Sequence, residues 1–365
     1  MTRFIRIIRW GTVLGSTPAF SVPFPPLPTT PPAFVEDWSR GKIDPAKWYP
    51  LRKKWGEGNH GVVPENVRIE TDQVKGATRA VLRCEAHGDQ YDGPVRGLWG
   101  KRSRVGGVLV SKPFFASGRF EVVMKIGDTK PFSGCPANPR VPAGSVPAIW
   151  TYAFRSVKVP GDQADDFSRD TPLYNPFIQN FGRGLAFYWS ELDFPEFGKG
   201  GRFDQAMYNT FLNRRHDSQM LDLPDVADGT YHTYTSVWET ERIPLPGIRD
   251  EQVVRFEGYW WVKTRQVAFA SYEAMPLVRR GANDYLLCRG KRVRHWIDGV
   301  YIAENTTFVP CMAAQLNLGI WLPDWAGKAP WSTSSVRFAS IRIWPSHDPG
   351  DVTGILVDDI TNNIE

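Results

Sequence analysis

The 365-residue sequence predicts an all-β fold, a two-sheet antiparallel sandwich of the jelly-roll type. Three observations favour it. Short segments rich in β-branched and aromatic residues recur along the chain, separated by Gly, Pro, Asn and Asp. Several of them alternate inward- and outward-facing residues, as half-buried strands do. No long segment with helical periodicity competes with them, and the chain is long enough for one large β domain with a substantial core.

The predicted strands follow one another through most of the chain, and no internal repeat separates them into copies. In sequence order the clearest segments are residues 79–86, 107–112, 118–126, 146–154, 231–239, 294–303, 315–322 and 335–344. Between the fifth and sixth segments the sequence is less regular and basic: residues 241–294 hold eleven Lys and Arg against six Asp and Glu. We therefore expect a single β domain over residues 34–347.

Two flanking segments differ from this domain in composition. Residues 18–32 contain seven prolines, which favour extended polyproline geometry, so residues 1–33 are predicted to be an arm or linker that can dock a partner. Residues 348–365 carry five acidic residues and no base, which predicts an acidic surface tail. Of the formal net charge of +5, the arm contributes +3 and the tail −5, so the domain carries +7.

The same composition argues against several classes of protein. The charge falls short of the basic stripe of a nucleic-acid binder, and no apolar run is long enough to span a bilayer. The four cysteines lack zinc-type spacing; two disulfides are possible, as are free buried thiols. Because Arg6 and Arg9 interrupt its apolar stretch, the N-terminus is not expected to be a cleavable signal peptide. Neither a metal nor a cofactor is expected.

The stretch FYWSELDFPEFGKG, residues 187–200, places Glu191, Asp193 and Glu196 within a run of aromatic residues. On a strand, Trp189, Glu191 and Asp193 share a face, whereas Glu196 has the wrong parity. A β-bulge would add one residue and bring Glu196 to the same face. Pro195 lies in that interval, and a bulge is one of the few places where a strand accepts proline. The sequence thus predicts three carboxylates on one face.

These carboxylates have two interpretations. They are solvent-facing charges of an edge strand, or they form a catalytic set in a cleft. Carboxylates among aromatics are costly unless they line a cleft. A retaining glycosidase needs a nucleophile and an acid/base carboxyl roughly 5–5.5 Å apart. A neighbouring carboxylate also keeps the acid protonated at rest, which favours the catalytic interpretation.

At this point the sequence resembles glycoside hydrolase family 16, which has a concanavalin A-like jelly roll and a catalytic E-x-D-x-x-E signature whose extra residue forms a bulge. ELDFPE matches that signature, and the likeness extends in order over residues 34–344. Its other matches are FVEDWSRGKIDPAKW, GVLVSKPFFASGRFEVVMKI, VPAIWTY, YHTYTSVWE and HWIDGVYI. The resemblance implies a concave cleft for a polysaccharide substrate.

The resemblance also implies roles for individual residues. Glu191 would be the nucleophile, Asp193 its hydrogen-bonding helper and Glu196 the general acid/base. Four further side chains would bind substrate. Trp189 would stack on the sugar next to the cleaved bond, and Trp150 and Trp321 would line the cleft. Asn317 is the fourth, although a strand Asn can equally bond backbone.

The sequence departs from the family in two places. The family needs only a short hairpin where residues 241–294 stand, so this basic stretch is largely an insertion that extends the cleft, binds a partner or is a surface excursion. Many members also bind a structural calcium through an Asp near the last strand, where this chain has Ala339.

The sequence therefore predicts a retaining, endo-acting glycoside hydrolase that cleaves a β-linked polysaccharide and lies outside the cell or on a surface. The alternative is a non-catalytic carbohydrate-binding or structural protein on the same fold, such as a virion component joined to an assembly partner through its arm. The family that the sequence resembles includes members that act on laminarin, mixed-linkage glucan, agar and carrageenan with the same motif.

Overall fold

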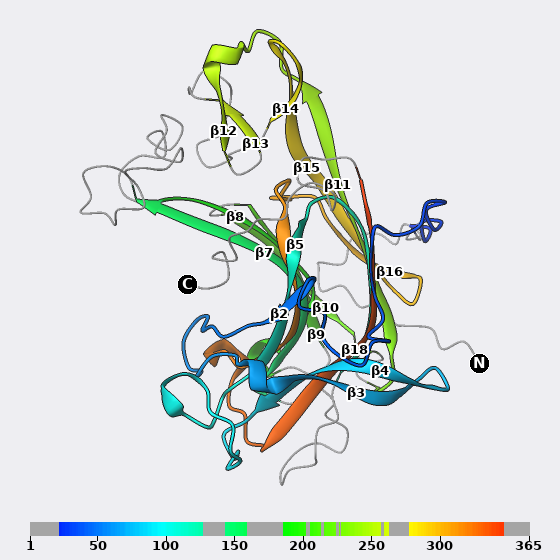
Figure 1. Ribbon diagram of the computed structural model, residues 1–365, viewed down its shortest axis with the longest axis vertical. Helices are drawn as coiled ribbons and strands as arrows, with labels where there is room; N and C mark the ends of the chain where they lie inside the picture. Colours follow the sequence, from blue (N-terminus) through cyan, green and yellow to red (C-terminus); the bar gives the residue numbers. More distant parts are fainter. Residues whose placement is uncertain are drawn as a thin grey trace, which may run out of the picture.

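The computed structural model describes residues 22–126, 143–158, 185–201, 205–212, 215–223, 226, 228–256, 259–262 and 277–346. In this part of the chain the regular structure is strand with short 3-10 turns, arranged as two antiparallel sheets (Figure 1). The prediction of an all-β, two-sheet jelly roll is confirmed.

The first sheet has eleven strands in the order β12-β13-β14-β15-β11-β6-β18-β4-β3, with β1 beside β18 and β16 beside β15. Their bounds are β1 (Phe34–Glu36), β3 (Val67–Val74), β4 (Ala77–His87), β6 (Gly118–Ile126), β11 (His232–Pro244), β12 (Val253–Phe256), β13 (Tyr259–Val262), β14 (Leu277–Gly281), β15 (Asp284–Ile297), β16 (Val300–Asn305) and β18 (Thr333–Pro345).

The second sheet has seven strands in the order β10-β9-β8-β7-β17-β5-β2. Their bounds are β2 (Trp48–Pro50), β5 (Gly107–Phe115), β7 (Val146–Lys158), β8 (Leu185–Phe197), β9 (Gln205–Leu212), β10 (Arg215–Asp222) and β17 (Ala314–Trp321). Five 3-10 turns lie in the described connections: η1 (Pro64–Asn66), η2 (Leu98–Gly100), η5 (Lys199–Gly201), η7 (Asp250–Gln252) and η8 (Asp324–Ala326).

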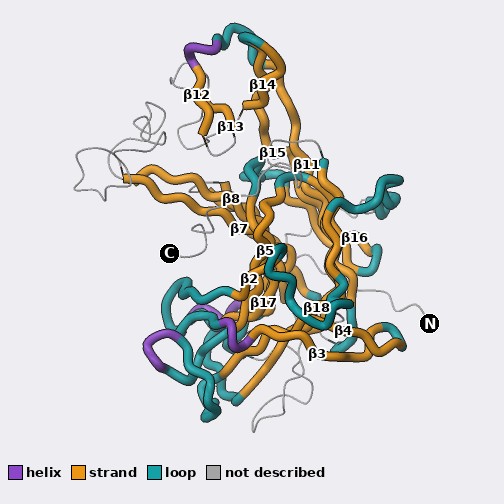
Figure 2. The backbone as a smooth tube through the Cα atoms, viewed as in Figure 1, coloured by secondary structure: helices purple, strands orange, loops and turns teal. Residues whose placement is uncertain are grey.

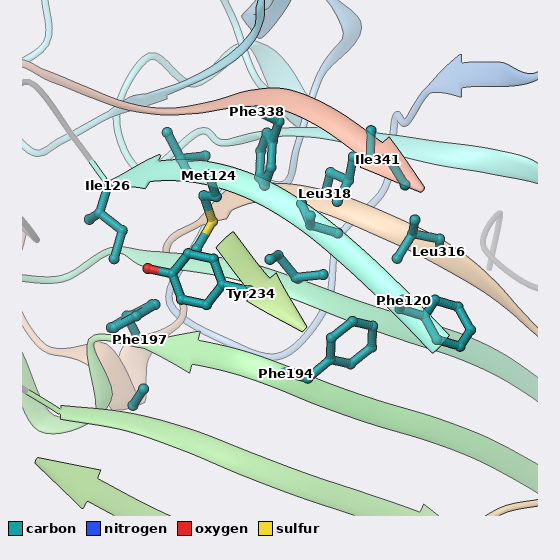
Figure 3. Packing of buried hydrophobic residues seen from close by; sticks show 14 of the residues in the cluster. Phe120, Met124, Ile126, Phe194, Phe197, Tyr234, Leu316, Leu318, Phe338 and Ile341 are labelled. Atoms are coloured by element: carbon teal, nitrogen blue, oxygen red, sulfur yellow. The ribbon is translucent and has the colours of Figure 1, made fainter. Parts of the chain in front are cut away.

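The hydrophobic core lies between the two sheets. Figure 3 shows Phe194 and Phe197 of one sheet facing Phe120 and Met124 of the other. Side chains alternate along a strand, so each residue that enters this core leaves its neighbours on the outer face. The outer face of the seven-stranded sheet, called the site face below, therefore carries the residues between the core positions of β8, β7 and β17.

The predicted strand over 294–303 is a hairpin, not one strand. β15 ends at Ile297 and β16 begins at Val300, and Asp298 and Gly299 form the turn between them. Both turn residues have positive φ, 48° and 80°, which is the backbone that an Asp-Gly hairpin turn requires. The other predicted strand segments lie in β4, β5, β6, β7, β11, β17 and β18.

Residues 241–294 are more regular than expected. They contain the end of β11, all of β12, β13 and β14, and most of β15, which together extend the eleven-stranded sheet into a long ribbon (Figure 1). A small core of its own supports the ribbon, in which Ile248, Val253, Leu277 and Tyr285 are buried.

The described part of the proline-rich arm, residues 22–33, lies against the outer face of the eleven-stranded sheet. Arg119 Nη1 donates to the carbonyl oxygens of Pro25 (2.9 Å) and Pro26 (3.1 Å), and Trp344 Nε1 donates to Thr30 O (3.0 Å). The Phe24 ring meets Trp296 edge-on at 6.0 Å. Residues 1–21 of the arm and the predicted acidic tail lie outside the described residues.

Cys84, Cys288 and Cys311 are buried. Of the disulfides that the cysteine count allows, none forms among these three. None of the helices in the described ranges is both long and apolar enough to cross a membrane.

Candidate active site

The three carboxylates of the sequence motif lie on β8, near the middle of the seven-stranded sheet. Leu192, Phe194 and Phe197 of this strand enter the core between the sheets. By alternation Glu191 and Asp193 face the other way, onto the site face. Asp193 is 4% exposed, and the two glutamates are partly exposed.

The predicted β-bulge is present. Asp193 pairs with Trp150 on β7 and with Asn209 on β9. Glu196 lies three residues after Asp193 on β8. Its partners, Ala148 and Met207, lie only two residues from Trp150 and Asn209. One residue of β8 is therefore extra on both sides. For this reason Phe194 and Phe197 can both enter the core although three positions separate them, and Glu196 returns to the face of Asp193.

Pro195 lies inside this bulge, and the Phe194–Pro195 peptide bond is cis. The strand register then fixes which residues neighbour the three acids. Glu191 lies between Phe211 of β9 and Tyr152 of β7, and Asp193 lies between Asn209 and Trp150. The strand neighbours of Glu191 and Asp193 are thus aromatic and amide side chains.

Burial perturbs all three carboxyl groups, and the charge of Asp193 adds to this effect at the two glutamates. Burial and the charge of Asp193 raise the pKa of Glu191 well above its usual range. Burial raises the pKa of Asp193 to about 7, although hydrogen bonds from Asn209 and Glu191 act in the opposite direction. Burial and the charge of Asp193 likewise raise the pKa of Glu196. The cluster therefore retains protons near neutral pH, as a site for general acid catalysis must.

Each acid also has a specific hydrogen-bond partner. Asn209 Nδ2 donates to Asp193 Oδ2 over 2.6 Å, and the Trp189 indole N–H donates to Glu191 Oε2. Glu191 and Asp193 hydrogen-bond each other, and Trp321 bonds the Glu196 carboxyl. Two acids that share a hydrogen bond titrate as a pair, so their proton belongs to the pair.

The other predicted site residues lie on the same face. Trp189 stacks on Phe211 with ring centroids 4.9 Å apart and planes 7° from parallel. Trp150 pairs with Asp193 on one side and with Asn317 of β17 on the other, so both lie in the row that contains Asp193. Trp321 lies at the end of β17. The structure thus brings all seven predicted residues to one face of one sheet.

The amide nitrogen and the amide oxygen of Asn317 differ in their hydrogen bonding. Its Nδ2 donates to Gln315 O at 2.8 Å, the backbone bond that a strand asparagine can make. Its Oδ1 is buried and has no hydrogen-bond partner among the residues that the structure describes. The same holds for Asn209 Oδ1. Buried amide oxygens normally find donors, so these two are exceptions in the floor of the site face.

Sequence reasoning missed four neighbours of the carboxylates: Asn209, Phe211, Tyr152 and Trp55. A signal existed for the first two, because Asn209 and Phe211 alternate with buried residues in QAMYNTFL and therefore share a face. Tyr152 stands two residues after Trp150 in a strand already predicted. Trp55 lies in a loop, and only the structure shows that its ring meets Trp150 at 5.9 Å.

A separate cavity of about 540 Å³ lies on the outer face of the other sheet. Its lining mixes acids such as Glu36 and Glu121 with bases such as Arg79 and Arg342, and it holds no carboxylate of the motif. Ala339 also lines it, so the position where many family members place a calcium ligand offers only a methyl group. In the described ranges no group of three or more His, Cys, Asp or Glu could hold a metal ion.

No family model matches the sequence, and no curated protein matches it. Several solved structures are similar to this chain in fold. A β-glucanase from Bacillus licheniformis is 14% identical, with 87% of this chain and 100% of the other covered and a TM-score of 0.48. A glycoside hydrolase family 16 endo-glucanase from Bacteroides ovatus is 13% identical, with 85% and 99% covered and a TM-score of 0.45.

Porphyranase B from Zobellia galactanivorans is 14% identical, with 85% of this chain and 90% of the other covered and a TM-score of 0.46. The likeness of this chain to the three structures is one of fold.

Proposed function

We propose that the protein is a retaining, endo-acting glycoside hydrolase that cleaves a β-linked polysaccharide. The observation that carries the proposal is the bulge in β8, which brings Glu196 to the face of Glu191 and Asp193. The raised pKa of Glu196 supports it, because this route needs a protonated acid beside an ionised nucleophile, and the hydrogen bond from Trp189 favours the ionised form of Glu191.

In the proposed first step, Glu191 attacks the anomeric carbon while Glu196 gives its proton to the departing glycosidic oxygen. The bond from the anomeric carbon to that oxygen breaks and a covalent glycosyl–Glu191 ester forms. Asp193 supports this step when it holds the proton of the pair and donates it in a hydrogen bond to Glu191. Asn209, which donates to Asp193, fixes the orientation of that carboxyl.

In the second step Glu196, now ionised, removes a proton from water, and the oxygen of that water attacks the anomeric carbon. The ester breaks, Glu191 leaves as a carboxylate, and the released sugar has the configuration of the substrate. Trp189 would stack on the sugar bound at Glu191, and Asn317, the strand neighbour of Trp150, would contribute to substrate binding from the row that contains Asp193.

Endo action is proposed because of where β8 lies in the sheet. Two strands, β9 and β10, lie on one side of it, and four, β7, β17, β5 and β2, lie on the other. A glycan that crosses the strands would therefore have sheet beneath it on both sides of the cleaved bond, as cleavage within a chain requires.

Replacing one carboxylate tests this function. Glu191→Gln should abolish release of reducing ends from the polysaccharide and leave the circular dichroism spectrum unchanged. Glu304→Gln, a carboxylate on β16 of the other sheet, is the matched control and should stay active. Full activity in Glu191→Gln would overturn the assignment.

The substrate is found with a panel of laminarin, mixed-linkage β-glucan, agar and carrageenan. With the polymer that is cleaved, endo action predicts that viscosity falls before reducing ends accumulate. The proton NMR spectrum of the first product should show retained anomeric configuration. Binding to one of these polymers without any turnover would instead favour a carbohydrate-binding protein. The comparisons do not support a virion component.

A further inference from the structure

The cavity on the outer face of the eleven-stranded sheet lies where two strands part. The pairing of β4 with β18 ends at Leu82 and Phe338, and from Ile341 onward β1 takes the place of β4 beside β18. Figure 2 shows the hairpin of β3 and β4 extending beside β18 to a teal turn. The cavity of about 540 Å³ is lined by residues of both β4 and β1, so it lies in the fork between them. This volume is typical of small-molecule sites.

Apolar side chains form one part of the cavity lining, namely Val35, Val74, Ala80, Val123 and Ala339. Three of them, Val74, Val123 and Ala339, pack together with Val81 and Tyr231 in a small hydrophobic cluster. The register between β18 and β6 shifts between Phe338 and Ser340, so Ala339 is the extra residue of a bulge. The cavity therefore has an apolar wall that can cover the body of an organic ligand.

Two of the three acids in the lining have cationic partners that lie outside it. Glu36 Oε2 accepts a hydrogen bond from Trp48 Nε1 (3.0 Å) and lies 3.8 Å from Lys47 Nζ. Glu121 Oε1 accepts hydrogen bonds from Nε (3.0 Å) and Nη2 of Arg119. Lys47 and Arg119 do not line the cavity. These two carboxylates are therefore neutralised without the bases of the cavity.

The three bases of the lining, Lys75, Arg79 and Arg342, are exposed. Within the part of the chain that the structure describes, their side chains form no ion pair and no hydrogen bond. The third acid, Asp37, accepts hydrogen bonds from Ser39 N (3.0 Å) and Ser39 Oγ (2.6 Å). Three bases thus face one acid that has no cationic partner at hydrogen-bond distance, and this balance attracts anions.

The three cations come from both sides of the fork. Lys75 and Gly76 form the two-residue turn between β3 and β4, and both have positive φ, 50° and 85°, as such a tight turn requires. Arg79 lies on β4, and Arg342 lies on β18 opposite Val35 of β1. Strand pairing and the tight turn fix these backbones before a ligand binds, which lowers the entropy lost on binding.

We propose that this cavity, here called the fork cavity, binds a sulfate or phosphate ester of a small organic molecule. Such an ester presents three anionic oxygens, which Lys75, Arg79 and Arg342 can share, and a guanidinium group can donate two parallel hydrogen bonds to them. The hydroxyl groups of Thr233 and Ser340 also line the cavity, and its apolar wall would cover the organic part. The fork cavity is on the opposite sheet from the catalytic carboxylates and does not depend on the proposed function.

Calorimetric titration of the full chain tests this proposal with defined probes. These are phenyl sulfate, phenyl phosphate, inorganic sulfate, inorganic phosphate and phenol, which keeps the ring without the charge. At least one ester should bind, and the tighter of the two identifies the anionic group. Each inorganic ion should bind more weakly than its ester, because it leaves the apolar wall uncovered. Added salt should weaken binding, because the cations are exposed.

Removing one cation at a time locates the site. Arg79→Gln and Arg342→Gln should each weaken binding of the ester by about three- to tenfold, the range for one partly exposed charge contact. Both side chains are exposed, so the fold and the release of reducing ends should not change. Arg280→Gln removes an exposed arginine from β14 of the same sheet that does not line the cavity, and this matched control should bind as the parent does.

Unchanged affinity for the esters in both Arg79→Gln and Arg342→Gln would overturn the fork cavity as an anion site. Phenol binding as tightly as the esters, or no binding of any probe, would also overturn it. Inorganic ions that bind as tightly as their esters would overturn the organic ligand. Glu191→Gln separates the two sites: it should bind the esters as the parent does, and altered affinity would place the probe at the carboxylates. Loss or retention of hydrolysis in Glu191→Gln tests the proposed function alone.

Discussion

Carboxylates on the outer faces of the two sheets have pKa values that are shifted in opposite directions. On the eleven-stranded sheet burial would raise the pKa of Glu85, yet hydrogen bonds from His87 and Arg68 and the charge of Arg83 lower it to about 2. On the site face burial raises the pKa of Asp193 to about 7, and its nearest charged neighbours are two further acids.

The side chains that surround each carboxylate explain this difference in pKa. Glu70 and Glu85 lie among arginines on neighbouring strands, with Arg83 reaching both of them at 3.2 and 2.8 Å. Such pairs stabilise the ionised form in the folded protein. Burial of Asp193 does the reverse, and an unfavourable ionisation of this kind is typical of functional sites. The predictions below test this contrast, starting with the largest effect.

Removing the proposed proton donor should have the largest effect. Glu196→Gln should lower kcat on the polysaccharide by about 10²- to 10⁴-fold, because the leaving oxygen then departs without a proton. An aryl glycoside with an acidic leaving group needs no such proton in the first step, so its kcat/KM, which reports that step, should fall much less, although the second step still needs Glu196 as base. Steady-state kinetics on both substrates check this. Equal losses of kcat/KM on the two substrates would mean that Glu196 does not protonate the leaving oxygen.

Removing the charge of Asp193 should stabilise the protein. Because folding raises its pKa from 3.8 to about 7, the folded state binds more protons than the unfolded state between these values. Stability therefore falls as pH rises through this window. Asp193→Asn should increase the free energy of unfolding by about 1–3 kcal/mol at pH 8 and leave it unchanged below about pH 4.

Urea unfolding at the two pH values provides the measurement. Asn keeps an oxygen that can accept the hydrogen bond from Asn209, so the contact itself is preserved. Activity should fall in the same variant, because Glu191 loses its ionisable partner. A variant less stable than the parent at pH 8 would contradict the cost assigned to this charge.

The same change on the other sheet should have the opposite sign. Folding lowers the pKa of Glu85 from 4.5 to about 2, so its stabilisation is present above about pH 4.5 and disappears as pH falls toward 2. Glu85→Gln should therefore cost about 1–2 kcal/mol at neutral pH and nothing near pH 2. Unfolding at both pH values, with activity as the control, separates this effect from one on the site.

Much of this contrast could be predicted from the sequence. Alternation predicted most strands, and the parity of Glu196 together with Pro195 predicted the bulge. Asn209 could not be paired with Asp193, because sequence alone does not give the register between β8 and β9. Likewise, the residues around Arg104 in the sequence do not indicate that its side chain donates to backbone carbonyls more than 200 positions away, at Leu322 and Pro323. Local periodicity predicts faces, whereas contacts between distant loops depend on the whole fold.

The smallest effect should come from the hydrogen bond between Trp189 and Glu191. The indole N–H lowers the pKa of Glu191 against burial and the charge of Asp193. Trp189→Phe removes this donor and keeps a ring that can stack on Phe211. The pKa of Glu191 should then rise further, and the acidic limb of kcat/KM should move to higher pH by about one unit or less. Phe211→Leu removes the stacking partner and keeps the donor, so its limb should not move. A shift of equal size in both variants would show that packing, and not the hydrogen bond, sets the ionisation of Glu191.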